Sequence, residues 1–279
     1  MENTDSRPAV GIIGYGSMGA ALAKAMARTE AARNGFSLRV LARSNRKKAA
    51  AEAPDIAFAD SLQELVTRSD ILLVAVLPEH VEQVVRDILP CLPREDWPRE
   101  KLLLSVAAGV TLAQLGSLAG EKLAIARVMP NTLVEVGRGL FGVCHGPDLS
   151  DKQKGMIASL FGALGTVIPL EESGMNAFTA LAGCGPGFMF HIMDSFCEAG
   201  VSAGLTRENS RAIALELMGG CARLAEVTGA HPVLLREQGT SPAGMTIAGL
   251  NLLDRTGVRG HIIDAVLTAR DQGRAMDAD

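Results

Sequence analysis

Short apolar runs alternate with stretches of helical character through the first part of the chain. Each run is almost continuously apolar and ends at glycine, proline or a polar residue, which is the pattern of a strand buried on both faces of a parallel sheet. The predicted strands cover residues 9–13, 38–42, 56–58, 71–76, 102–106, 123–129 and 166–170. The predicted helices between them cover residues 17–32, 46–53, 62–66, 81–89 and 152–164. Strands that alternate with helices indicate parallel pairing through right-handed crossovers.

Beyond the last predicted strand the chain is almost entirely helical. Helical stretches cover residues 187–203, 207–228 and 259–274, and turn residues such as Gly204 and Pro232 separate them. We therefore predict an α/β domain over residues 1–170, followed by an all-α domain over residues 171–279 without a flexible linker.

Composition and charge exclude several classes of protein. The 279 residues carry 27 basic and 31 acidic side chains, a net charge of −4, and no basic block stands out, so a nucleic-acid surface is not expected. The five cysteines are scattered without a CxxC pair, which favours reduced thiols in a cytoplasmic protein and offers no metal-ligand spacing. No apolar run is long enough to span a membrane. We expect a cytoplasmic protein that binds neither a metal nor a membrane.

A glycine-rich loop joins the first predicted strand to the first predicted helix. The loop is the GxGxxG run Gly14, Tyr15, Gly16, Ser17, Met18 and Gly19. In this context the first glycine permits a tight turn, the second lets backbone approach a pyrophosphate, and the third lets helix and strand pack closely. The run predicts a dinucleotide-binding Rossmann domain. The alternative is a glycine-rich turn without a ligand.

The end of the second predicted strand indicates which dinucleotide binds. An NAD site usually has a carboxylate there for the ribose hydroxyls. This chain has Arg43, Ser44, Asn45 and Arg46 instead, and guanidinium groups suit a 2′-phosphate. We therefore predict NADP(H). The alternative is that both arginines are ordinary solvated charges.

Two further strand ends are expected beside the cofactor, since ligands bind at the carboxyl ends of parallel strands. The first end consists of Ala75, Val76, Leu77 and Pro78, and the second contains Ala107 and Ala108. Small residues and a proline there suit a wall near the nicotinamide ribose. Loop packing alone is the alternative explanation.

Two loops of small residues precede helical stretches in the second half of the chain. They cover residues 182–187 and 239–246. Free N–H groups at the start of a helix are a natural seat for a carboxylate, and the Thr246 hydroxyl can donate as well as accept a hydrogen bond. The alternative is ordinary capping by Thr240, Ser241 and Thr246.

Taken in order, these motifs resemble the pyrroline-5-carboxylate reductase family. The runs that carry the resemblance span nearly the whole chain, at residues 12–19, 75–78, 107–111, 127–132, 179–186, 200–205 and 240–250. The last run is the most specific, because Ser241-Pro242-Ala243-Gly244-Met245-Thr246 is similar to the family's Ser-Pro-Gly-Gly-x-Thr loop.

The resemblance implies a Rossmann domain followed by an all-α dimerisation and substrate domain. It also implies a homodimer, with dimers assembling into a higher homo-oligomer. The implied reaction is NADP(H)-dependent reduction of the cyclic imine 1-pyrroline-5-carboxylate to proline, a step of proline biosynthesis. The implied substrate-binding residues are Ser241, Ala243, Gly244, Met245 and Thr246, with Thr246 as the catalytic residue that orients the ring nitrogen and relays a proton.

The chain departs from the family's pattern at several positions. The family's Ser-Gly-Ser-Gly-Pro-Ala is replaced by a run with Ala182 and Cys184, and the first glycine of Ser-Pro-Gly-Gly is replaced by Ala243. Gly239 stands where an aliphatic residue is usual, and Asn176 replaces a common aspartate. These departures leave open a related cyclic imine as the substrate, or an NADPH-binding dimer with weak catalysis.

A second class of oxidoreductase shares the glycine loop. The β-hydroxyacid dehydrogenases carry a lysine on the long helix after the domain boundary. The corresponding residues 188–203 contain no lysine, which disfavours that class.

Overall fold

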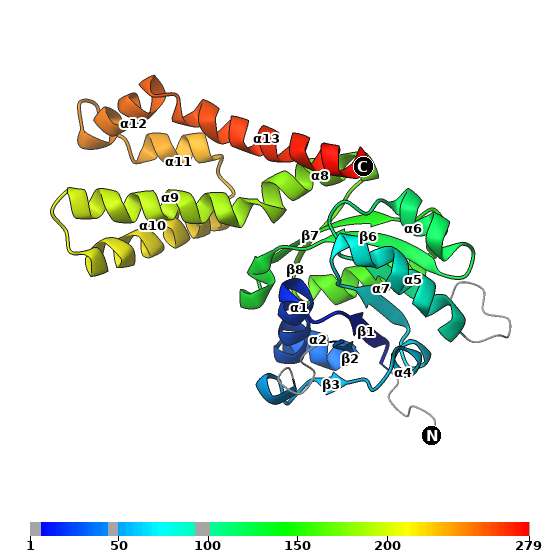
Figure 1. The fold of residues 1–279 in the computed structure, drawn as a ribbon. Coiled ribbons are helices and arrows are strands. Elements are labelled where there is room, and N and C mark those ends of the chain that lie inside the picture. Colours follow the sequence, from blue (N-terminus) through cyan, green and yellow to red (C-terminus); the bar gives the residue numbers. More distant parts are fainter. Residues whose placement is uncertain (1–6, 44–49, 93–100, 279) are drawn as a thin grey trace. The chain divides into compact units, whose positions relative to one another are not determined.

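The computed structural model describes residues 7–43, 50–92 and 101–278 (Figure 1). The chain forms two compact units, one made of Met1–Gly183 with Arg270–Asp279, and one of Cys184–Ala269. The α/β and then all-α architecture predicted from the sequence is confirmed. The division of the chain into domains at residues 170 and 171 stays a prediction.

A single eight-stranded sheet forms the centre of the first unit, with the strand order β3-β2-β1-β4-β5-β6-β7-β8. The strands are β1 (Ala9–Ile13), β2 (Ser37–Leu41), β3 (Ala57–Phe58), β4 (Ile71–Val74), β5 (Leu102–Ser105), β6 (Ala124–Met129), β7 (Gly139–His145) and β8 (Gly165–Pro169). Strands β1 to β6 are parallel, whereas β7 runs antiparallel to β6 and pairs in parallel with β8. The order reverses between β1 and β4, which is the switch point where doubly wound sheets bind ligands.

Helices cover both faces of this sheet. The α-helices before the helical unit are α1 (Ser17–Arg28), α2 (Glu30–Gly35), α4 (Leu62–Thr67), α5 (Val81–Ile88), α6 (Leu112–Ala119), α7 (Asp151–Gly162) and α8 (Met175–Phe178). Ile71 and Leu73 of β4 belong to the core that contains residues of α1, α2 and α7. The alternate residues Leu72 and Val74 belong to the core under α4, α5 and α6. Successive side chains of a strand point to opposite faces, so a continuously apolar strand fills both cores.

Strand β7 was not predicted from the sequence, because Gly139 and Gly142 interrupt its apolar pattern. Both glycines have a packing role instead. A Cβ on Gly142 would lie 2.6 Å from the Phe178 ring, and one on Gly139 would lie 2.7 Å from the Phe141 ring. The short helix α6 was also missed.

The helix predicted over residues 17–32 is in fact two helices. Thr29 has extended backbone angles, and its N–H still donates to the Ala25 carbonyl at the end of α1. Its carbonyl then accepts from the Arg33 N–H in the first turn of α2. The β-branched threonine therefore ends one helix and begins the next.

Five helices make up or enter the second unit. They are α9 (Gly185–Ser202), α10 (Arg207–Thr228), α11 (Pro232–Gln238), α12 (Met245–Arg255) and α13 (Val258–Ala278), whose residues from Arg270 belong to the first unit. Helices α9 and α10 lie side by side (Figure 1). A Cβ on Gly200 would lie 2.6 Å from the Ser210 hydroxyl, so the glycine permits this close approach.

The helical unit has almost no core of its own. Among its residues, only Ser210 and Ala214 are buried. Large apolar side chains are exposed on its helices instead, among them Phe190, Phe196, Ile213, Leu217, Leu224, Val227, Leu252, Leu253, Ile262 and Ile263. An exposed apolar surface of this kind marks a protein–protein contact.

Candidate functional site

The loop after β1 turns sharply, and two of its glycines are required by packing. Gly14 has φ +106°, and a Cβ there would lie 2.5 Å from the Ala75 carbonyl oxygen. A Cβ on Gly19 would lie 2.3 Å from the Gly14 carbonyl oxygen. The Gly14 N–H donates to the Leu41 carbonyl at the end of β2 over 3.0 Å. These two glycines thus let α1 start directly against the ends of β1 and β4.

Gly16 differs from the other two glycines, because no atom would lie within 4 Å of a Cβ there. It is the exposed N-cap residue of α1, with no side-chain cap and no acidic residue in the first turn. The first N–H groups of the helix and its positive dipole end therefore face open space. This combination of free donors and empty room fits a pyrophosphate. Ser17 is exposed there, and Met18 packs against the core.

The Tyr15 side chain packs toward β3. Its ring meets the Phe58 ring edge to face, with centroids 5.4 Å apart. The hydroxyl oxygen is buried and has no hydrogen-bond partner. Burial raises the pKa of this phenol, and the negative charge of Glu52 raises it further. The contribution of Tyr15 to the loop is therefore that of its backbone.

The strand order brings the other two predicted strand ends to the same edge of the sheet. Ala75 is buried behind Gly14, Val76 is half-buried, and Leu77 is 62% exposed. Pro78 then opens a short 3₁₀ turn. From the end of β5, the Val106 N–H donates to the Val74 carbonyl at 3.1 Å.

After Val106, Ala107 is buried and Ala108 half-buried. The Ala107 N–H donates to the Ser105 hydroxyl at 3.3 Å. The glycine loop and both strand ends therefore lie on the carboxyl edge around the switch point, as the sequence predicted.

Arg43 is exposed two residues beyond β2, on this same edge. Ser44, Asn45 and Arg46 lie outside the described residues. Arg39, within β2, is instead engaged with Glu64, with 3.5 Å between Nη1 and Oε1. The two arginines therefore have different surroundings, and Arg43 is the one placed to meet a ligand at the strand end.

In the helical unit, the predicted substrate loop is a tight turn before α12. The Gly244 N–H donates to the Ser241 carbonyl at 3.1 Å, and Ala243 has φ +59°. A Cβ on Gly244 would lie 2.4 Å from the Ser241 hydroxyl, so this position also requires glycine. Met245 is 94% exposed, and Thr246 is exposed beside it.

The capping explanation of this loop is wrong. Helix α12 begins after Gly244 with no side-chain cap and no acidic residue in its first turn. The Thr240 hydroxyl donates to the Arg236 carbonyl at 2.7 Å and so ends α11 rather than starting α12. By contrast, α6, α7 and α10 each begin with a side-chain cap, from Thr111, Ser150 and Thr206. The N–H groups at the start of α12 are left for another partner.

The other small-residue loop contains a π-helical turn, Thr179–Gly183. Ala182 is buried in it, and Cys184 follows as the exposed N-cap residue of α9, without a side-chain cap. The buried Asn131 holds this turn, because its Nδ2 donates to the Ala182 carbonyl at 2.9 Å. The same side chain accepts the Leu140 N–H at 3.1 Å. Sequence reasoning took Asn131 only as the end of a strand.

Arg127 is a second residue whose position the sequence did not reveal. It is buried in the middle of β6, and its Nη1 donates to Glu172 Oε1 at 2.7 Å. Cys144 stands opposite Arg127 on β7. Burial, with Glu172 nearby, raises the pKa of the Cys144 thiol to about 12. This thiol stays protonated at neutral pH and is not a nucleophile.

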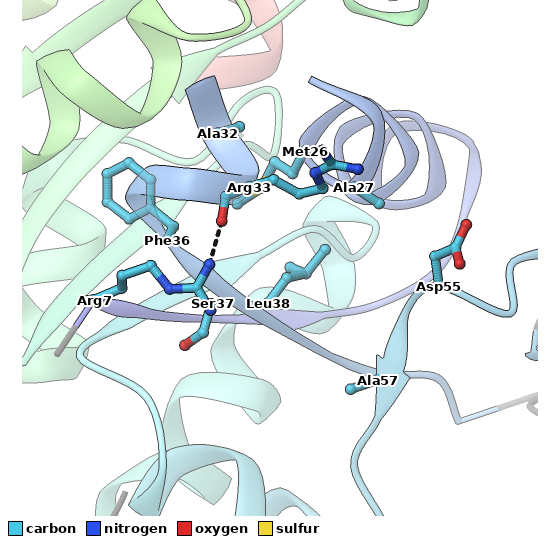
Figure 2. A pocket seen from close by; sticks show the side chains of 10 residues that line it. All are labelled: Arg7, Met26, Ala27, Ala32, Arg33, Phe36, Ser37, Leu38, Asp55 and Ala57. Carbon is cyan, nitrogen blue, oxygen red and sulfur yellow. Dashed lines mark hydrogen bonds between the residues drawn. The ribbon is translucent and has the colours of Figure 1, made fainter. Parts of the chain in front are cut away.

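A pocket of about 470 Å³ lies at the opposite edge of the sheet. Figure 2 shows it near the amino ends of β2 and β3, with the Arg7 guanidinium donating to the Arg33 carbonyl. Its lining residues are Arg7, Met26, Ala27, Ala32, Arg33, Phe36, Ser37, Leu38, Asp55 and Ala57. None of these is a predicted site residue, so the pocket is separate from the candidate site.

Two further searches cover residues 7–43, 50–92 and 101–278. Within them, no group of three or more His, Cys, Asp or Glu side chains is arranged to hold a metal ion. No helix in this part of the chain is both long and apolar enough to cross a membrane.

Two family models match the chain. Residues 172–276 match the model described as pyrroline-5-carboxylate reductase dimerisation. Residues 9–109 match the model described as NADP oxidoreductase coenzyme F420-dependent.

Named relatives match over almost their whole length. The chain is 34% identical to pyrroline-5-carboxylate reductase from Pisum sativum, over 96% of this chain and 95% of that protein. It is 33% identical to pyrroline-5-carboxylate reductase from Aquifex aeolicus, over 92% and 93%.

Solved structures of the same name have the same fold. Plasmodium falciparum pyrroline carboxylate reductase with NADP bound has a TM-score of 0.85 and 27% identity, covering 99% of this chain and 100% of that one. Pyrroline-5-carboxylate reductase from Coxiella burnetii has a TM-score of 0.85 and 26% identity, covering 96% and 97%.

Proposed function

Because the chain belongs to the pyrroline-5-carboxylate reductase family, we propose that it reduces the cyclic imine 1-pyrroline-5-carboxylate to proline with NADPH, as a step of proline biosynthesis. The observation that carries this proposal is the extent of the match. The pea enzyme is matched over 95% of its length, so the nucleotide-binding part and the helical part are both present. The chain is thus an NADP-dependent oxidoreductase rather than a separate binding module.

The residues proposed to hold NADP(H) lie along the carboxyl edge of the sheet. They are Gly14, Tyr15, Gly16, Ser17, Met18, Gly19, Arg43, Ser44, Asn45, Arg46, Ala75, Val76, Leu77, Pro78, Ala107 and Ala108. The uncapped start of α1 and the open space at Gly16 support the pyrophosphate part. When bound, the reduced nicotinamide supplies the hydride, and the chain's own task is to bind and orient.

Arg43 is the described residue proposed to select NADPH over NADH. Replacing Arg43 with alanine should weaken NADPH binding by about 1–3 kcal/mol, the worth of a charge-assisted hydrogen bond, and leave NADH binding nearly unchanged. Titration calorimetry with both nucleotides measures the difference. Arg39→Ala is the matched control, because Arg39 already faces Glu64. Unchanged selectivity in Arg43→Ala would refute the 2′-phosphate assignment.

The substrate residues are proposed to be Ser241, Ala243, Gly244, Met245 and Thr246. The free N–H groups at the start of α12 suit the substrate carboxylate, and no acidic side chain competes for them. Thr246, whose side chain makes no hydrogen bond in the described structure, is proposed as the catalytic residue, orienting the ring nitrogen and relaying a proton. A cyclic imine is basic, so a neutral hydroxyl suffices for this role.

The chain forms a homo-oligomer through its helical part, since residues 172–276 match a dimerisation model and the helical unit exposes its apolar side chains. We further propose that dimers assemble into a higher oligomer. A cytoplasmic location is proposed as well, and the free state of all five cysteines supports a reducing compartment.

An absorbance assay of NADPH consumption tests the function. The purified protein is given 1-pyrroline-5-carboxylate, its six-membered ring homologue, and a ketone related to a hydroxyacid. Turnover should be fastest with the five-membered imine and absent with the ketone. Faster turnover of the larger imine would make the chain a reductase of a related imine. NADPH binding without turnover of any imine would refute the enzymatic proposal.

A further inference from the structure

The loop before α12 contains a type II turn that ordinarily requires glycine at its third position. The Gly244 N–H closes the turn by donating to the Ser241 carbonyl at 3.1 Å. Pro242 at the second position fixes its own φ near the value that the turn needs. Ala243 at the third position has φ +59°, and among residues 7–43, 50–92 and 101–278 it is the one non-glycine residue with a positive φ. Glycine is the residue that adopts this conformation without strain.

The alanine strains this turn, because an L-residue in the left-handed region brings its Cβ close to a carbonyl oxygen. A type I turn relieves the strain. It keeps the φ of Pro242, moves Ala243 to a negative φ, and rotates the Pro242–Ala243 peptide by roughly half a turn. The Ala243 N–H then points to the opposite side of the turn.

Gly244 holds the rest of the loop fixed while this peptide rotates. Its N–H is bonded to Ser241, and a Cβ there would collide with the Ser241 hydroxyl. The change is therefore confined to one peptide group next to the free N–H groups of α12.

We infer that the Pro242–Ala243 peptide is a two-state positioning element, and that a bound carboxylate selects the type II form present in this structure. The inference rests on the proposed function, which seats the substrate carboxylate at the start of α12. Ala243 then makes the enzyme less well organised for the carboxylate than a glycine would, because part of the free protein has the Ala243 N–H turned away.

Steady-state kinetics with two variants and two substrates test this inference. Ala243→Gly removes the strain, and Ala243→Asn relieves much of it while adding bulk, since asparagine tolerates the left-handed region. The substrates are 1-pyrroline-5-carboxylate and 1-pyrroline, which is the same ring without a carboxylate. Ala248→Gly is the matched control, because it makes the same chemical change one turn further along α12.

Both variants should lower the KM for 1-pyrroline-5-carboxylate and leave kcat unchanged. The decrease should reach up to about tenfold in Ala243→Gly, equivalent to about 1.4 kcal/mol of preference for the type II form. The KM for 1-pyrroline should stay constant, and Ala248→Gly should behave like the unmodified protein with both imines.

Three results would overturn the inference. One is an unchanged KM in Ala243→Gly, and another is an equal decrease with both imines. The third is a raised KM in Ala243→Asn, which would mean that the Cβ acts by steric exclusion and not through the backbone. A wild-type protein that reduces neither imine would instead refute the proposed function itself.

Discussion

At the scale of single residues, the three loop glycines have different physical roles although they belong to one motif. A Cβ on Gly14 or Gly19 would collide with a backbone carbonyl, so these two are needed to build the fold. A Cβ on Gly16 would meet nothing within 4 Å, so the chain itself has no need of glycine there. The open space at Gly16 is explained by a ligand that approaches the backbone.

This difference predicts opposite behaviour for two alanine variants. Gly16→Ala should leave the melting temperature nearly unchanged and weaken NADPH binding at least about tenfold, because the new methyl group occupies the space for the pyrophosphate. Gly14→Ala should lower the free energy of unfolding by about 2 kcal/mol or more, since it combines a positive φ with a 2.5 Å contact to Ala75. Thermal unfolding and titration calorimetry measure both. Normal NADPH affinity in a folded Gly16→Ala protein would contradict the placement of the pyrophosphate.

At the scale of helices and strands, the sequence predicted best what depends on local pattern. Strands β1 and β4 are continuous apolar runs, and β1 was predicted with its observed bounds. Strand β7 was missed because its glycines serve contacts with Phe178 and Phe141, which sequence neighbours do not reveal.

The candidate site divides in the same way. The glycine loop and the strand ends follow from local pattern together with the strand order. The role of Asn131 depends on Leu140 and on Ala182, a residue far along the chain, so no local signal could have revealed it. The strain at Ala243 likewise needed a measured backbone angle.

Asn131 gives a prediction at this scale, because it ties the start of β7 to the π-helical turn Thr179–Gly183. Asn131→Ala should lower the free energy of unfolding by about 2–3 kcal/mol, since it leaves a buried N–H and a buried carbonyl without partners. Asn131→Asp keeps the acceptor for the Leu140 N–H but replaces the donor to Ala182 with a carboxylate oxygen. Hydrogen exchange should then speed up in the π-helical turn more than at Leu140. Urea unfolding and exchange mass spectrometry measure these effects, and equal exchange at both places would contradict the double anchor.

At the scale of the whole molecule, the two units differ in how they are stabilised. The first unit has continuous cores on both faces of its sheet. The second buries almost nothing large, although its helices are rich in apolar residues. Most helical stability in proteins comes from packing of an apolar face, so this unit needs a further surface to cover it. Its match to a dimerisation model identifies that surface as another copy of the chain.

Helix α10 offers a direct test of this requirement. Ile213, Leu217, Leu224 and Val227 recur at helical spacing and are all exposed, whereas Ser210 and Ala214 of the same helix are buried. The apolar stripe therefore faces away from the chain's own core. Leu224→Asp places a charge in it, and burying an unpaired carboxylate on association is costly.

The Leu224→Asp protein should elute as a monomer, or as a much weaker dimer, in size-exclusion chromatography with light scattering. Its melting temperature should fall and become strongly dependent on protein concentration, because folding and association are linked. Val136→Asp is the matched control. Val136 is 74% exposed, more than the 53% of Leu224, but it lies in the first unit outside the dimerisation match. A Leu224→Asp protein with the native mass and stability would show that α10 does not face the partner subunit, and equal dissociation by both variants would show that the apolar stripe has no special role.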